Sequence, residues 1–197
     1  EQLSSLNYLK IDDNKFNELP ESFSHLKNLE TLICRDNKLT TLPKNFGLLN
    51  NLNYLDLSNN LINTLPESFG NLNNLQYLDI EQNDIQYLPD NFGSLNSLET
   101  LKASFNFIKE LPTSFGNLSN LKILELTQNN LKFLPDNFGS LHNLEQLYLN
   151  NRENPMRMFS FYDGNKFIPD TTRIERKLND LKNLTPSFKN LKKLNNI

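Results

Sequence analysis

The stretch LNYLDLSNNLINTLPESFGNLNN, residues 52–74, is followed without a gap by LQYLDIEQNDIQYLPDNFGSLNS, residues 75–97. The two stretches place leucine or isoleucine, asparagine, proline, phenylalanine and glycine at matching positions. This unit of 23 residues occurs six times, with starts at Leu6, Leu29, Leu52, Leu75, Leu98 and Leu121, and a seventh unit begins at Leu144 before losing register. A fixed period of this length indicates a solenoid, in which each unit buries its apolar side chains against its neighbours.

The first part of each unit alternates apolar and polar residues, which is the pattern of a half-buried strand. Consecutive units should therefore pair their strands into one parallel sheet on the concave face. The second part reads L-P-x-x-F-G-x-L, and its proline favours a turn or the start of a helix. We therefore expect short helical or 3₁₀ segments on the convex face, with the recurring phenylalanine in the core.

An asparagine recurs at the ninth position of every unit, directly after the expected strand. The six residues are Asn14, Asn37, Asn60, Asn83, Asn106 and Asn129. The chain turns inward there, and its buried backbone groups need a side chain that both donates and accepts hydrogen bonds. We expect these asparagines to form a ladder that bonds each turn to the neighbouring coil.

These residues resemble the leucine-rich repeat family from Leu3 to about Leu149. The L-P-x-x-F-G-x-L form is similar to the 23-residue subclass found in Ras-group, Roco-type and bacterial leucine-rich repeat proteins. The resemblance implies a right-handed solenoid of the α/β class that binds proteins through its concave sheet. It implies no shared enzymatic activity and no cofactor.

The repeat array is predicted to span residues 1–151, with six full repeats and partial ones at each end. Residues 152–197 depart from the pattern and are interpreted as an irregular C-terminal repeat or cap. This cap would carry an inserted hairpin over 155–170, signalled by Asp163-Gly164, and a basic helix. Because both ends of the chain keep the leucine spacing, we expect a fragment of a longer protein.

Charge divides the chain, with a net charge of −8 over residues 1–151 and +5 over residues 152–197. An acidic sheet does not suit nucleic acid, which is bound by neutralising phosphates. No run of 18 apolar residues is present, so no membrane span is expected. His25 and His142 lie far apart in the coil, and no catalytic, metal or cofactor motif appears. We expect neither enzymatic activity nor a cofactor.

The outward-facing strand positions are where a partner would bind, and they carry seven acidic and three basic side chains. Aromatic anchors ringed by charge occur on three adjacent units. The predicted partner-binding residues are Tyr54, Asp56, Tyr77, Asp79, Glu81, Lys102 and Phe105. Phe105 and Phe107 are expected to reach solvent or a partner, unless a crevice beside Ala103 takes one ring. The partner is expected to be a protein or peptide, favourably one with a basic patch; the alternative is that these are ordinary solvated strand residues.

Two further alternatives stay open. The alternative binding site is the hairpin and tail, with Phe159, Phe161, Tyr162 and the basic residues from Arg173 onward. The alternative function is a regulatory or substrate-recognition segment of a larger enzyme, such as a Roco GTPase-kinase or a bacterial ubiquitin ligase. Cys34 is the single cysteine and occupies a core position. That disfavours the disulfide-capped extracellular class and leaves a bacterial secreted or surface protein, or a cytoplasmic one.

Overall fold

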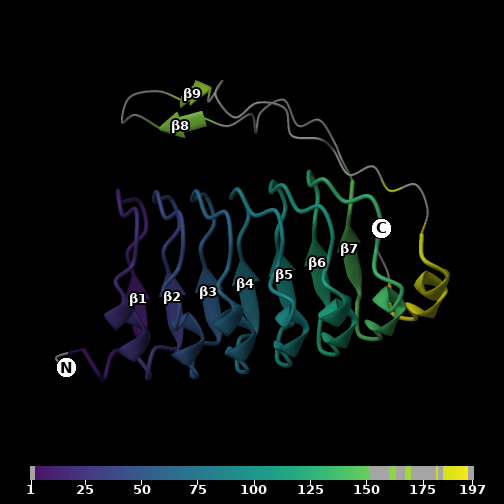
Figure 1. The fold of residues 1–197 in the computed structure, drawn as a ribbon, viewed down its shortest axis with the longest axis horizontal. Helices are drawn as coiled ribbons and strands as arrows, with labels where there is room; N and C mark the ends of the chain where they lie inside the picture. The colour runs from purple at the N-terminus through teal and green to yellow at the C-terminus, as the bar shows by residue number, and fades with distance from the viewer. Residues whose placement is uncertain (1–2, 151–159, 163–166, 170–180, 182–183, 195–197) are drawn as a thin grey trace.

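The computed structural model describes residues 3–150, 160–162, 167–169, 181 and 184–194. Seven short strands lie side by side in one sheet, in the order of the chain (Figure 1). They are β1 (Tyr8–Lys10), β2 (Thr31–Ile33), β3 (Tyr54–Asp56), β4 (Tyr77–Asp79), β5 (Thr100–Lys102), β6 (Ile123–Glu125) and β7 (Gln146–Tyr148). All neighbours pair in parallel and in register, one repeat unit apart. This confirms the predicted solenoid with a parallel sheet.

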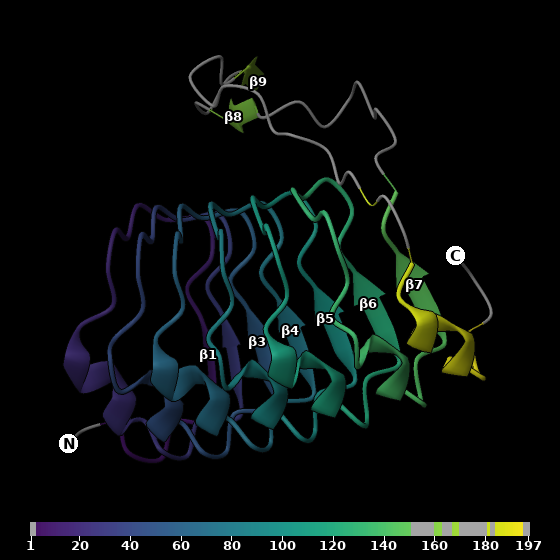
Figure 2. The same ribbon diagram turned by 45° about the vertical axis from the view of Figure 1, so that its right-hand side comes forward.

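Each strand from β1 to β6 is followed by a return leg, and short 3₁₀ helices form on the return legs, on the side of the coil opposite the sheet (Figure 2). They are η1 (Glu21–His25), η2 (Phe46–Leu48), η3 (Glu67–Asn71), η4 (Phe92–Ser94), η5 (Thr113–Asn117), η6 (Phe138–Ser140) and η8 (Pro186–Asn190). Pro66 precedes η3 with φ −67° and ψ 151°, so the proline keeps the backbone extended up to the start of the helix. The expected short segments on the convex face are therefore 3₁₀ helices.

The return legs are of two kinds that alternate along the array. Where serine precedes the phenylalanine, as in η3, the 3₁₀ helix has five residues; where asparagine does, as in η4, it has three. Ser68 Oγ accepts the N–H of Gly47 at 3.1 Å and donates to the carbonyl of Lys44 at 2.6 Å. Asn91 Nδ2 instead donates to the carbonyl of Glu67 at 2.9 Å. The shape of the return leg thus repeats every two coils, whereas the repeat pattern in the sequence predicts a period of one 23-residue unit.

A column of phenylalanine rings runs the length of the core. From Phe23 to Phe138, neighbouring rings lie 6.1–6.5 Å apart with planes within 5° of parallel. Phe188 of η8 continues the column, with its ring 6.3 Å from that of Phe138. The hydroxyl of Ser187 also accepts the N–H of Gly139 at 3.0 Å. Residues 184–194 therefore pack as a seventh return leg, against the coil that contains η6. Each fully buried ring stabilises the fold by roughly 1.5–3 kcal/mol.

The asparagine ladder forms as predicted. Asn37 Nδ2 donates to the carbonyls of Cys34 and Arg35 in its own turn, at 3.2 and 3.1 Å. It also donates to the carbonyl of Ile11 in the preceding coil at 2.9 Å, and its Oδ1 accepts the N–H of Phe16 at 3.1 Å. The same four contacts recur at Asn60, Asn83 and Asn106. Each rung satisfies buried backbone groups in two coils, which is why asparagine recurs there.

Two strands pair antiparallel inside the segment predicted to be a hairpin. They are β8 (Ser160–Tyr162) and β9 (Phe167–Pro169), with Phe161 opposite Ile168. The Asp163-Gly164 turn and most of the predicted basic helix lie outside the described residues. In the part of the chain that the structure describes, no helix has both the length and the apolar character needed to cross a membrane.

Candidate functional site

Two tyrosines stand in contact at the middle of the concave sheet. Tyr54 on β3 and Tyr77 on β4 are partners in the strand register. Their rings are stacked with centroids 4.4 Å apart and planes 1° from parallel. The residues on either side in the same row are the shorter Thr31 and Thr100. A large, rigid and half-buried aromatic pair of this kind is the side-chain type most often found to anchor a protein partner.

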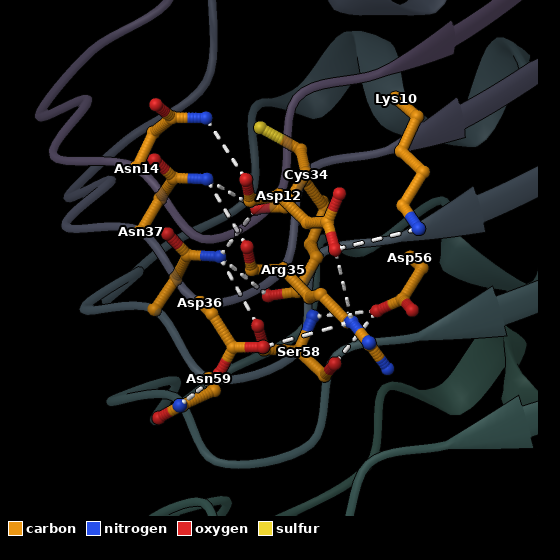
Figure 3. A network of polar contacts seen from close by, with 12 residues as sticks. Lys10, Asp12, Asn14, Cys34, Arg35, Asp36, Asn37, Asp56, Ser58 and Asn59 are labelled. Carbon is orange, nitrogen blue, oxygen red and sulfur yellow. Dashed lines mark hydrogen bonds and ion pairs between the residues drawn. The ribbon is translucent and has the colours of Figure 1, made fainter. Parts of the chain in front are cut away.

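Two carboxylates lie beside the tyrosines, one on each of the same two strands. Asp56 Oδ1 accepts the N–H and the hydroxyl of Ser58, at 3.0 and 2.7 Å (Figure 3). Asp79 Oδ1 accepts the N–H of Glu81 at 3.0 Å, and its Oδ2 accepts the hydroxyl of Tyr77 at 3.3 Å. Both aspartates are only 8% exposed. The alternation in the sequence did not predict this burial.

Burial changes the acid–base behaviour of this cluster. Burial is the main reason that the pKa of Asp79 is raised to about 6. The charge of Asp56 acts in the same direction, while the hydrogen bond from the Glu81 backbone, the charge of Lys102 and the hydrogen bond from Tyr77 oppose the shift. Burial likewise raises the pKa of Glu81 to about 7, reinforced by Asp79 and Glu125. These two carboxyl groups therefore become protonated at a higher pH than carboxylates in open solvent.

The tyrosine hydroxyls stay protonated beside these acids. Burial is the main cause that raises the pKa of both Tyr54 and Tyr77, and the neighbouring aspartates add to it. The Tyr77 hydroxyl is therefore a stable donor to Asp79. The pair offers a partner apolar ring surface and polar edges at the same place.

Ion pairs border the cluster on both sides. Towards the C-terminal end, Lys102 on β5 lies 3.8 Å from Glu125 on β6. Towards the N-terminal end, Asp12 lies 3.7 Å from Lys10 and 3.6 Å from Arg35 (Figure 3). Exposed pairs of this kind stabilise a fold by only about 0–1 kcal/mol. Their main effect is to place basic groups at the edges and leave the centre of the sheet acidic.

Phe105 has an unusual backbone conformation. It occupies the eighth unit position, directly after the strand, where φ is positive in six successive units. The residues are Asp13, Asp36, Asn59, Gln82, Phe105 and Gln128, with φ of 53–57°. Aspartate and asparagine tolerate this left-handed region, and their recurrence is the signal that could have predicted it. A bulky ring is an outlier there. Phe105 and Phe107 are both half-buried, so each ring is partly open to solvent.

The structure places the seven predicted residues on β3, β4, β5 and the turns that follow them. Sequence reasoning did not single out Ser58 and Ser104, whose hydroxyls bond the acids. Within the described residues, no group of three or more histidine, cysteine or acidic side chains is arranged to hold a metal ion. Cys34 is buried, and burial raises the pKa of its thiol to about 12. Of the alternative site, Phe161 and Tyr162 lie in β8, while Phe159 and Arg173 lie outside the described residues.

Comparison with known proteins identifies the family. The family described as "leucine-rich repeat region" matches residues 1–74, 44–107 and 67–196, and together these matches cover nearly the whole chain. The chain therefore belongs to the leucine-rich repeat family. No curated protein sequence matches it.

Several solved structures share the fold. The leucine-rich repeat protein LIC12759 of Leptospira interrogans is 28% identical, with a TM-score of 0.61 over 100% of this chain and 55% of that one. The Arabidopsis thaliana receptor kinase ectodomain GASSHO1/SCHENGEN3, solved with CASPARIAN STRIP INTEGRITY FACTOR 2, is 32% identical, with a TM-score of 0.69 over 76% of this chain and 19% of that one. The plant peptide hormone receptor RGFR1, solved with RGF2, is 30% identical, with a TM-score of 0.66 over 73% and 24%. This chain thus spans about half of the first protein and a quarter or less of the receptors.

Proposed function

We propose that the chain is a non-catalytic protein-interaction module whose concave sheet binds a protein or peptide partner that carries a basic patch. The observation that carries this proposal is the unpaired acidic cluster beside the stacked tyrosines. Among the described residues, none of Asp56, Asp79 and Glu81 forms an ion pair with a basic side chain. Lys102 acts on Asp79 and Glu81 from nearby but is itself paired with Glu125, so it offsets only part of the cost of withdrawing these carboxylates from water. A partner's lysine or arginine would supply the missing charge.

The dimensions of the sheet suit this role. Seven strands at about 4.8 Å spacing make a surface roughly 30 Å across. That width is enough for a peptide or for one face of a protein domain. The central row of Tyr54 and Tyr77 supplies contact area, while the acids beside it supply charge. Complementary charge speeds encounter with a basic partner, and salt weakens that effect. Phe105, at the rim of the same face, adds an apolar contact.

The comparisons support the binding of peptides in general terms. RGFR1 and GASSHO1/SCHENGEN3 are receptors solved with peptide or protein ligands, and their arrays share this fold. We further propose that the array belongs to the 23-residue subclass, and that the protein is either a bacterial secreted or surface protein or a cytoplasmic one. Sequencing the gene on both sides of this region tests the location, and it also tests the alternative of a segment within a larger enzyme.

A selected peptide provides the test. The full chain is immobilised at neutral pH, binders are isolated from a random peptide display library, and a binder rich in lysine or arginine but free of histidine is synthesised. Its affinity is then measured for the double variant Tyr77→Ala with Asp79→Lys. The matched control is Tyr87→Ala with Glu110→Lys, which makes the same changes on exposed return legs. Circular dichroism verifies that both variants fold.

The proposal expects the concave variant to lose at least tenfold in affinity while the control binds like the parent chain. A deletion of residues 156–168 should leave binding intact. If the deletion abolishes binding and the concave variant binds normally, the hairpin is the site and the concave assignment is wrong. A selection that yields no basic peptides contradicts the proposed partner chemistry.

A further inference from the structure

We propose that this concave site is acid-sensitive, binding a basic partner when Asp79 and Glu81 are both ionised and releasing it when they take up protons. The inference rests on the proposed function, because it concerns the same surface and the same class of partner. It adds a regulatory property that follows from how the two carboxyl groups are grouped and covered.

The geometry joins the two carboxyl groups into one unit. Asp79 is the last residue of β4, and Glu81 lies two residues later, so both side chains point to the concave face. The backbone N–H of Glu81 donates to Asp79 Oδ1 at 3.0 Å, which fixes the aspartate beside the turn. Asp56, one strand away, lies directly opposite Asp79 in the register. Three acidic groups therefore share one small area of the sheet.

The groups that face this pair come from four neighbouring strands, β3 to β6, and from the turn after β5. From β3 come Asp56 and Tyr54, and from β4 itself comes Tyr77, which donates its hydroxyl to Asp79. The charged groups on the other side are Lys102 at the end of β5 and Glu125 at the end of β6. Ser104, in the turn after β5, hydrogen-bonds Glu81.

Lys102 does not neutralise the pair by itself. Its ammonium lies 3.8 Å from Glu125, so this cation is shared with a third acid. Asp79 is 8% exposed and bonded to two partners, and Glu81 is partly covered as well. Like charges held close in a poorly hydrated site favour the neutral form of one or both acids. A partner's cation placed there would oppose that preference and hold both acids ionised.

The sign of the effect follows from the direction of the shifts. Burial raises the pKa of Asp79 to about 6 and that of Glu81 to about 7, so both are largely charged at about pH 8. At about pH 5.5 the pH lies below both pKa values, so only a small fraction of molecules keeps both charges. If binding requires both, the apparent affinity falls in proportion to that population. The partner's lysine and arginine stay charged across this window, so the loss originates in this chain.

The experiment measures the affinity of the histidine-free basic peptide for the full chain by calorimetry, at about pH 8 and about pH 5.5. The parent chain should bind more than tenfold more weakly at the lower pH. Asp79→Asn and Glu81→Gln should each weaken binding at about pH 8 and flatten the pH dependence. Carboxyl resonances of both residues, followed by NMR, should titrate between pH 5 and 8, roughly two units above unperturbed acids.

The matched control replaces both histidines, His25→Gln with His142→Gln. His25 ends η1 and His142 follows η6, so both lie on the convex side. This variant should keep the pH dependence of the parent chain. If parent affinity is equal at the two pH values while the Tyr77→Ala with Asp79→Lys variant fails to bind, the acid switch is wrong and the binding site stands. If Asp79→Asn, Glu81→Gln and the double variant Tyr77→Ala with Asp79→Lys all bind the peptide with the affinity of the parent chain, the proposed function itself is wrong.

Discussion

Replacement of Asp79 by asparagine is expected to stabilise the folded chain at neutral pH. Burial raises the pKa of this carboxyl from 3.8 to about 6, so the folded chain binds more protons than the unfolded chain between those values. The free energy of unfolding therefore decreases as pH rises through that window. A shift of two pKa units corresponds to about 3 kcal/mol. This is the upper limit on how much the ionised Asp79 carboxylate destabilises the folded chain at about pH 8.

Asparagine suits the site in every respect except charge. Its amide oxygen can still accept the N–H of Glu81, now bonded at 3.0 Å, and its amide group can still meet the Tyr77 hydroxyl. Removing the charge also relieves Glu81, whose own pKa the aspartate raises. We expect the free energy of unfolding to increase by about 2–3 kcal/mol at about pH 8, and by little at about pH 4, where the parent aspartate is protonated.

Urea denaturation followed by circular dichroism, at several pH values and with a constant slope against denaturant, measures this difference. Glu99→Gln is the control, because that carboxylate is 46% exposed and pairs with Lys122 at 2.7 Å. Its loss should change stability by at most about 1 kcal/mol. An asparagine variant that is less stable than the parent at about pH 8, or equally stabilised at both pH values, would refute desolvation of charge as the cause.

Three further perturbations test other parts of the structure. Asn83→Ala removes a fully buried side chain of the asparagine ladder and should lower the free energy of unfolding by about 1–3 kcal/mol. Asn73→Ala, at an exposed position, should change that free energy by at most about 0.5 kcal/mol. Equal changes for the two variants in urea denaturation would contradict the role of the ladder. Gly93→Ala would place a methyl carbon 1.8 Å from the carbonyl oxygen of Ser114, so its thermal midpoint should fall by several degrees. Phe105→Asn relieves a bulky ring at φ 57° and should stabilise the chain by about 1 kcal/mol while weakening peptide binding; unchanged affinity in the same calorimetric assay would remove Phe105 from the site.

The repeat period makes most of the fold predictable from the sequence. Each buried leucine, ladder asparagine and core phenylalanine recurs at the same unit position, so one local argument applies to every coil. The parallel sheet, the ladder at Asn60 and the stacked core at Phe69 follow from that regularity. Their physical cause is that neighbouring coils are the only surface against which a unit can bury its apolar residues.

The strand positions of the candidate residues could be predicted from the sequence, but their burial and acid–base chemistry could not. Alternation indicates that Asp79 faces outward, yet it says nothing about how far Tyr77 and the adjoining turn shield it from water. Burial, and with it the raised pKa, depends on side-chain packing between coils. The positive φ of Phe105 was hidden for another reason, because the aspartate and asparagine that signal it occur in other units.

Because serine and asparagine return legs alternate, coils can be added to or removed from the array without a mismatch only in pairs. Gly47 fits against Ser68 and Gly70 against Asn91, so each leg is shaped for a neighbour of the other kind. Deleting residues 52–97 would bring an asparagine leg back against a serine leg and preserve the contact. Deleting residues 52–74 alone would bring two asparagine legs together, with a carboxamide where the glycine N–H now meets a hydroxyl. Such an array can gain or lose two coils at a time. A gain or loss of an odd number of coils places two return legs of the same kind in contact, and these do not fit each other.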